Sequence, residues 1–172
     1  LCMQQFRAAD SMTDSIAALA ALSTIDGPER DAAMSTFYER AKANNEALVI
    51  NKWFGVQAMA DTPTVLADVK ALMEHEAFDA TNPNRFRSLI NTFAASPAAF
   101  HAADGSGYRF IADQVIETDK RNPQVAARLA SSFNTWKRHN EARQALMRAE
   151  IERIKKEAKS KDTLEIVTRA LA

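Results

Sequence analysis

The five prolines of the chain divide it into segments that each begin like an α-helix. Four prolines directly follow a residue whose side chain can cap a helix, in the pairs Thr62-Pro63, Asn82-Pro83, Ser96-Pro97 and Asn122-Pro123, while Pro28 follows Asp26-Gly27. Proline fits the first helical position because no hydrogen bond is lost there, and Ser, Thr and Asn side chains cap the free amides. The prolines therefore predict helix starts, which restricts the chain to helical folds with short connections.

Apolar residues between the prolines recur at a spacing of three to four, and no segment alternates with the period of two that marks a strand. This pattern predicts about nine or ten helices, at residues 1–9, 12–23, 28–43, 46–59, 63–74, 83–95, 105–119, 122–133, 139–158 and 161–171. Helix pairs return after roughly 35–40 residues, which is typical of an irregular armadillo- or HEAT-like superhelical stack of antiparallel helices. A plain helical bundle is the alternative. The stack is favoured because no helix is apolar on every side.

Length and composition limit the classes of protein to consider. A chain of 172 residues predicts one domain, and 47% hydrophobic residues are enough for a core. A formal net charge of zero argues against nucleic acid or an anionic membrane as the partner. No apolar run is long enough to span a bilayer. A single cysteine, Cys2, excludes an internal disulfide and fits a reducing compartment, so we expect a cytoplasmic protein. Because Leu1 already lies in a helical pattern with no cap before it, we expect the chain to continue upstream.

No catalytic or metal-binding set is predicted. His75-Glu76 lacks the second histidine of a zinc-binding helix, since position 79 is Asp79, and His101 and His139 are distant in sequence. The segment Asp104-Gly-Ser-Gly-Tyr108 has neither the lysine nor the preceding strand of a phosphate-binding loop. It predicts a tight turn in which both glycines adopt positive φ and Asp104 or Ser106 caps the next helix.

Basic and amide side chains gather at two of the predicted helix starts. Arg85 and Arg87 follow Pro83, where cations oppose the helix dipole, and Gln124 and Arg128 share one face after Pro123. Free amides at a helix start favour an anion. One interpretation is that these arginines pair with acids on neighbouring helices. The other is a concave positive rim that receives a carboxylate.

Two tryptophans and one charged segment have simpler explanations. Trp53 and Trp136 are expected to anchor helix packing. Arg, Glu and Lys alternate between residues 141 and 161, which predicts a solvated helix face or a docking face.

In order along its length, the chain resembles the C-terminal part of bacterial aminopeptidase N, a zinc metallo-aminopeptidase of the gluzincin group. The matching segments are Met12-Thr-Asp14, Asn51-Lys-Trp-Phe54, Asn82-Pro-Asn-Arg-x-Arg-Ser-Leu-Ile90, Phe100-His-Ala-x-Asp-Gly-Ser-Gly-Tyr108, Arg121-Asn-Pro-Gln-Val-Ala-x-Arg-Leu129, Arg143-Gln144 and Ala170-Leu-Ala172. Two departures are Asn51, where the family has Asp, and a turn at residues 94–97 that is one residue shorter. The shorter turn leaves the choice between Arg85 and Arg87 open.

The resemblance implies a helical domain that closes over the zinc site of a larger enzyme and encloses its substrate cavity. It implies that Arg87, Gln124 and Arg128, with Arg85 as the alternative to Arg87, line a peptide channel. The family's HExxH zinc helix and Gly-Ala-Met-Glu-Asn motif are absent here. The resemblance therefore implies a fragment without catalytic or metal residues, whose partners are the catalytic and N-terminal domains of the same alanyl-type aminopeptidase and a peptide substrate. The rival hypothesis is a free-standing helical-repeat scaffold that binds a protein or peptide partner.

Overall fold

The computed structural model describes all residues from 1 to 172, and every regular element in it is helical. The chain forms two compact units, residues 1–93 and residues 94–172, which are described separately. The prediction of an all-α, armadillo-like stack is confirmed. No helix is both long enough and apolar enough to cross a membrane.

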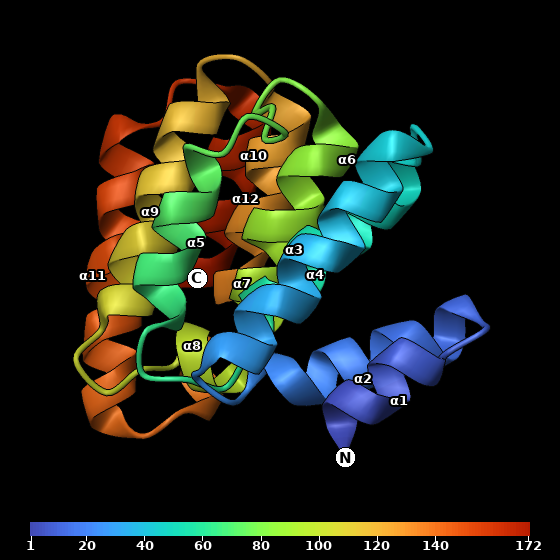
Figure 1. Ribbon diagram of the computed structural model, residues 1–172. Helices are drawn as coiled ribbons and strands as arrows, with labels where there is room; N and C mark the ends of the chain where they lie inside the picture. Colours follow the sequence, from blue (N-terminus) through green and yellow to red (C-terminus); the bar gives the residue numbers. More distant parts are fainter. The chain divides into compact units, whose positions relative to one another are not determined.

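Unit 1 is a succession of helix pairs, coloured blue to green in Figure 1. Its elements are α1 (Cys2–Ala8), α2 (Met12–Ser23), α3 (Pro28–Ala43), α4 (Ala47–Ala58), α5 (Val65–Met73), α6 (Pro83–Phe86) and a π-helical turn, η1 (Arg87–Asn91), with the start of α7 (Thr92–Ala95) at its end. Helix α2 packs on α1, α3 and α4, and α4 packs in turn on α3, α5 and η1. Helix α4 therefore connects the successive pairs, as expected for a helical-repeat stack.

Unit 2 is built around four helices. Its elements are α8 (Pro97–Phe100), α9 (Ser106–Asp119), α10 (Pro123–Ala130), the 3₁₀ turns η2 (Ser131–Phe133) and η3 (Trp136–Arg138), α11 (Glu141–Glu157) and α12 (Lys161–Leu171). Helix α9 contacts α10 and α11, and α12 contacts the same two helices, so the four enclose one core. That core is made by fully buried side chains, among them Tyr108, Ile111, Leu129, Met147 and Ile151.

The predicted helix starts are confirmed at Pro28, Pro83 and Pro123, and Pro97 opens the short helix α8. The caps differ in one place. Asn82, Ser96 and Asn122 accept backbone amides as expected, but α5 begins two residues after Pro63, and Thr62 caps nothing. The Thr62 hydroxyl instead lies 3.4 Å from that of Thr64, within a turn that precedes the helix.

Both tryptophans anchor packing, as predicted. The indole N–H of Trp53 donates to the Met34 carbonyl at 3.0 Å and ties α4 to α3. That of Trp136 donates to the Ala170 carbonyl at 2.8 Å and ties η3 to the end of α12. Each bond satisfies a polar group that burial would otherwise leave without a partner.

The prediction for the two glycines of the turn before α9 was half wrong. Gly105 has φ 71°, as expected, whereas Gly107 has no positive φ and belongs to the helix. Gly107 is required for a different reason, because a Cβ there would lie 2.4 Å from the Ala99 carbonyl oxygen. Asp104 accepts the Ser106 amide at 2.9 Å and closes the turn.

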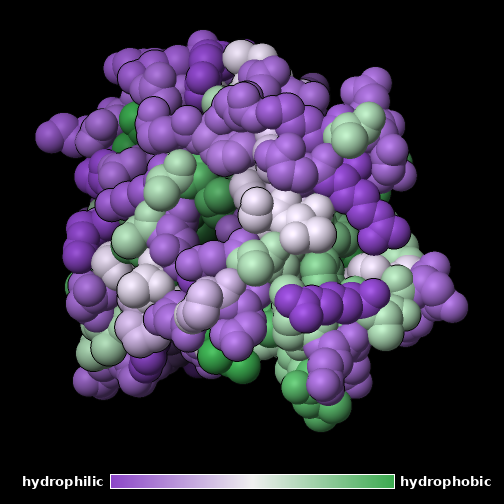
Figure 2. Space-filling view, in the orientation of Figure 1, coloured by the Kyte–Doolittle hydropathy of each residue, from purple (hydrophilic) through white to green (hydrophobic).

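Hydrophilic residues cover most of the face shown in Figure 2. The large hydrophobic side chains that remain exposed all belong to unit 1, and they are Leu1, Met12, Ile25, Leu48 and Met59. The only cysteine, Cys2, is a free thiol in α1.

Candidate functional site

The helix expected at residues 83–95 contains a π-helical turn where Arg87 lies. Asn82 accepts the amides of Asn84 and Arg85 and starts α6, which passes directly into η1. The Thr92 hydroxyl donates to the carbonyl of Arg87, five residues earlier, in keeping with the widened turn. Single π-turns inside helices are uncommon and are frequent at functional sites.

Buried polar atoms without partners concentrate around this turn. Of the seven such side-chain atoms in the chain, three lie on residues 85–91, namely Arg85 Nη1, Arg87 Nε and Asn91 Oδ1. A fourth, Asn51 Oδ1, lies on α4, the helix that packs against η1. A buried donor or acceptor without a partner costs about 1–3 kcal/mol. The segment therefore concentrates polar side-chain atoms whose hydrogen bonds are not made within the chain.

Helix α4 packs on the π-turn at Gly55. A Cβ at that position would lie 3.4 Å from the Ser88 carbonyl oxygen. Asn51 is one helical turn before Gly55 and so shares its face of α4. Sequence reasoning missed Asn51 and Asn91 as candidate residues, because neither stands in a charged cluster.

The two arginines of this segment have different surroundings. The Arg85 guanidinium lies over the Phe54 ring, 5.4 Å from its centroid. Burial lowers the pKa of Arg85, although nearby Tyr38 and Asp79 oppose that effect. Arg87 forms no ion pair, no ring contact and no side-chain hydrogen bond. Arg85 is therefore engaged in packing, whereas Arg87 has no such contact.

Gln124 and Arg128 lie on the outer face of α10. Asn122 caps this helix, and Val125, Ala126, Leu129 and Ala130 bury its opposite face. Both side chains are exposed, one turn apart, and neither forms a hydrogen bond or an ion pair. The interpretation that these arginines serve only local salt bridges is thus not supported at Arg87 or Arg128.

The predicted residues are divided between the two units. Arg85 and Arg87 belong to unit 1, whereas Gln124 and Arg128 belong to unit 2. The expectation that both pairs line a single concave face stays a prediction.

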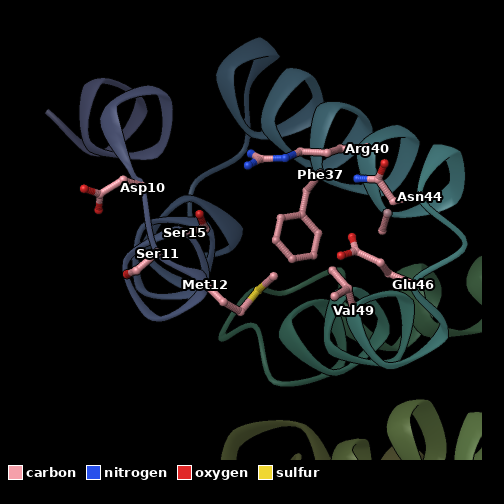
Figure 3. Close-up of a pocket in the computed structure, with 10 residues that line it drawn as sticks. Asp10, Ser11, Met12, Ser15, Phe37, Arg40, Asn44, Glu46 and Val49 are labelled. Atoms are coloured by element: carbon pink, nitrogen blue, oxygen red, sulfur yellow. The ribbon is translucent and has the colours of Figure 1, made fainter.

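A small cavity of about 150 Å³ in unit 1 was not anticipated from the sequence. Figure 3 shows the Phe37 ring at its centre, with Met12 and Val49 on one side and the charged groups of Arg40 and Glu46 around it. Neither charged group has a partner within the chain. The residues that line the cavity come from three separate segments, so no motif signals it.

No three side chains among His, Cys, Asp and Glu are placed to hold a metal ion. His75 is half-buried among aromatic rings, edge-on to Tyr38 at a centroid distance of 4.9 Å. Its neighbour Glu76 accepts hydrogen bonds from Tyr38 and Lys42.

Comparisons with known proteins identify relatives along the whole chain. The family described as "Domain of unknown function (DUF3458_C) ARM repeats" matches residues 1–172. Aminopeptidase N of Escherichia coli strain K12 is 45% identical over 174 residues, which cover 100% of this chain and 20% of that protein. Aminopeptidase N of Caulobacter vibrioides is 41% identical over 168 residues, which cover 96% of this chain and 19% of that protein.

The fold agrees with part of a solved aminopeptidase structure. The crystal structure of Legionella pneumophila aminopeptidase A in complex with aspartic acid superposes with a TM-score of 0.93 at 35% identity. The match covers 99% of this chain and 20% of that one. The chain thus spans about one fifth of the length of the relatives that it matches.

Proposed function

The chain belongs to the DUF3458_C family of ARM-repeat domains and matches the C-terminal region of aminopeptidase N, and on this basis we propose that it is a non-catalytic domain of a zinc aminopeptidase. The whole enzyme removes N-terminal residues from short peptides. Its two units together form one domain that closes the substrate cavity. The partners of this domain are the catalytic and N-terminal domains of the same cytoplasmic enzyme. A closed helical shell admits short peptides and excludes folded proteins.

The zinc ion of such an enzyme belongs to other domains. The side chains of this chain do not fit the ion, because no three potential ligands converge. The contribution of this chain is to bind and orient the peptide.

The observation that carries the proposal is that two arginines have no partner in the chain. Arg87 has a buried Nε without an acceptor, and Arg128 is exposed one helical turn after Gln124 and forms no ion pair. A guanidinium is the side chain best suited to bind a carboxylate, since it offers two parallel N–H donors. We propose that Arg87 and Arg128 attract the C-terminal carboxylate of the peptide, and that Gln124 binds its backbone.

The test is a comparison of substrates in the full-length enzyme. Arg87→Gln and Arg128→Gln should each lower kcat/KM for tripeptides by about ten- to a hundredfold, because a charge-assisted hydrogen bond contributes about 1.5–3 kcal/mol. Aminoacyl anilides lack the distal carboxylate and should be cleaved at the normal rate. Equal losses for peptides and anilides would show structural damage and contradict the proposed role.

Arg85→Gln is the matched control for Arg87→Gln. It removes the same charge two residues away, from a side chain that stacks on Phe54. We expect it to leave the ratio of peptide to anilide cleavage near that of the wild type. A selective loss of peptide cleavage in this variant would assign the carboxylate contact to Arg85 instead.

A further inference from the structure

A groove of about 710 Å³ in unit 2 has a charged lining that is wholly basic. Its polar residues are His101, Arg138, His139, Asn140 and Arg143, and small residues of α8 and the following turn complete the wall. No aspartate or glutamate lines it. None of the residues proposed for the peptide channel lines this groove.

The imidazole of His101 is held firmly at this groove. Its Nδ1 lies 2.7 Å from the hydroxyl of Tyr108, which is fully buried in the core. Nε and Nη2 of Arg143 both donate to the His101 carbonyl, at 3.3 and 3.2 Å. Nε2 of His101 has no partner. The ring thus presents one free nitrogen from a position that the fold determines.

His139 packs against His101, with the ring centroids 4.3 Å apart. The side chain of His139 forms no hydrogen bond, and neither does the exposed guanidinium of Arg138. Arg143 donates twice to the His101 carbonyl and also forms a hydrogen bond with the Tyr108 hydroxyl. Nε2 of His101, the His139 ring and the Arg138 guanidinium therefore meet beside Arg143 with no acceptor of their own.

The electrostatics of the groove disfavour additional positive charge. Burial lowers the pKa of His101, and His139 and Arg143 lower it further, while no carboxylate acts on it. The nearest acids in sequence are Asp104 and Glu141. The Asp104 carboxylate accepts the amide and hydroxyl of Ser106, and Glu141 is exposed in the first turn of α11 without an ion pair. An anion in the groove would relieve the repulsion among the cations.

We propose that this groove binds a phosphate-type dianion between Arg138, His139 and Arg143, with His101 at its base. A tetrahedral oxyanion directs its acceptor oxygens toward several sides and carries a second negative charge, whereas a carboxylate is planar and monovalent. The second ionisation of a phosphate monoester lies near pH 6, in the range where imidazoles titrate. Binding of the dianion and protonation of His101 therefore favour each other.

The chain has only three histidines, so NMR of the imidazole Cε1–H groups gives three signals, with His75 of unit 1 as an internal control. Inorganic phosphate is added at constant ionic strength. We expect the His101 and His139 signals to move saturably and the His75 signal to stay in place. The titration midpoint of His101 should rise in phosphate. Signals that do not move, or that all move alike, would overturn the proposal.

Variants separate this site from general attraction to a basic surface. Arg138→Gln should weaken phosphate binding about tenfold or more, because it removes a charge-assisted contact. Arg169→Gln removes the same charge from an exposed, unpaired residue near the end of α12 and should leave the affinity unchanged. Equal losses in the two variants would contradict a specific site. Acetate that bound as tightly as phosphate would contradict the preference for a dianion.

Discussion

Replacing Gly107 with Ala should destabilise unit 2, because the added methyl group would meet backbone atoms. The Cβ would lie 2.4 Å from the Ala99 carbonyl oxygen, 2.5 Å from that of Phe100 and 2.9 Å from the Phe100 carbonyl carbon. These atoms belong to α8 and cannot rotate away as a side chain can. Relief of the overlap requires α8 and α9 to move apart at a site where both are buried.

The magnitude follows from two opposing effects. Overpacking of a closed contact typically costs about 1–3 kcal/mol and occasionally more. The higher helix propensity of Ala returns at most about 1 kcal/mol. All three distances are well below normal contact distance and involve backbone atoms, so we expect a cost near the upper end of this range. The net loss in the free energy of unfolding should be about 2 kcal/mol.

Gly55→Ala is the matched control, since Gly55 is also helical and lies at a close helix contact. Its Cβ would be 3.4 Å from the Ser88 carbonyl oxygen and 3.9 Å from the Thr92 hydroxyl, which are ordinary contacts. We expect this variant to be neutral or slightly more stable than the wild type. Urea denaturation of both variants, followed by circular dichroism, provides the comparison. If Gly107→Ala were as stable as Gly55→Ala, the close approach of α8 to α9 would be refuted.

Two further predictions concern buried polar contacts. Burial alone raises the pKa of Asp119, but bonds from the Ser160 hydroxyl and the Lys159 and Ser160 amides outweigh it, so its folded pKa lies below the ordinary value. The Asp119 carboxylate stabilises the fold above its unfolded pKa, and this stabilisation is lost as the pH falls through the folded pKa. Asp119→Asn should therefore lower the free energy of unfolding by about 1.5–3 kcal/mol at pH 7 and by progressively less in acid. A difference in urea titrations that does not depend on pH would contradict this. Trp53→Phe removes the bond from the indole N–H to the Met34 carbonyl and should lower stability by about 0.5–1.5 kcal/mol, measured in the same way. An unchanged stability would show that the bond contributes nothing.

Local rules in the sequence predicted most of the fold. Proline after Asn or Ser marked three helix starts correctly because capping and a fixed φ act within a few residues. At Thr62-Pro63 a helix also begins within two residues, but Thr62 does not cap it, because the Thr62 and Thr64 hydroxyls pair with each other inside a turn. Helix 122–133 was expected to be continuous, but it tightens to a 3₁₀ turn after Ala130, where the Ser131 hydroxyl donates to the Ala127 carbonyl.

The candidate sites were only partly predictable. Arg87 was found from its charge at a helix start, but the π-turn around it was not, because Phe86, Leu89, Ile90 and Phe93 have the spacing of an ordinary helix. The reason why residue 107 must be glycine was not predicted, because only the packing of α8 on α9 reveals it.

The basic groove was missed for a similar reason. His101 and His139 are far apart in sequence and meet only through the packing of unit 2. Contacts of this kind depend on tertiary structure, which periodicity and capping rules do not describe.

The most direct measurement of the central proposal compares a tripeptide with its C-terminal amide in the full-length enzyme. The wild type should prefer the free acid by about tenfold or more in kcat/KM, since the amide removes the charge that Arg87 and Arg128 are proposed to bind. In Arg87→Gln and Arg128→Gln this preference should shrink, while cleavage of the amide changes little. An equal preference for acid and amide in the wild type, or a preference that both variants retain, would contradict the account.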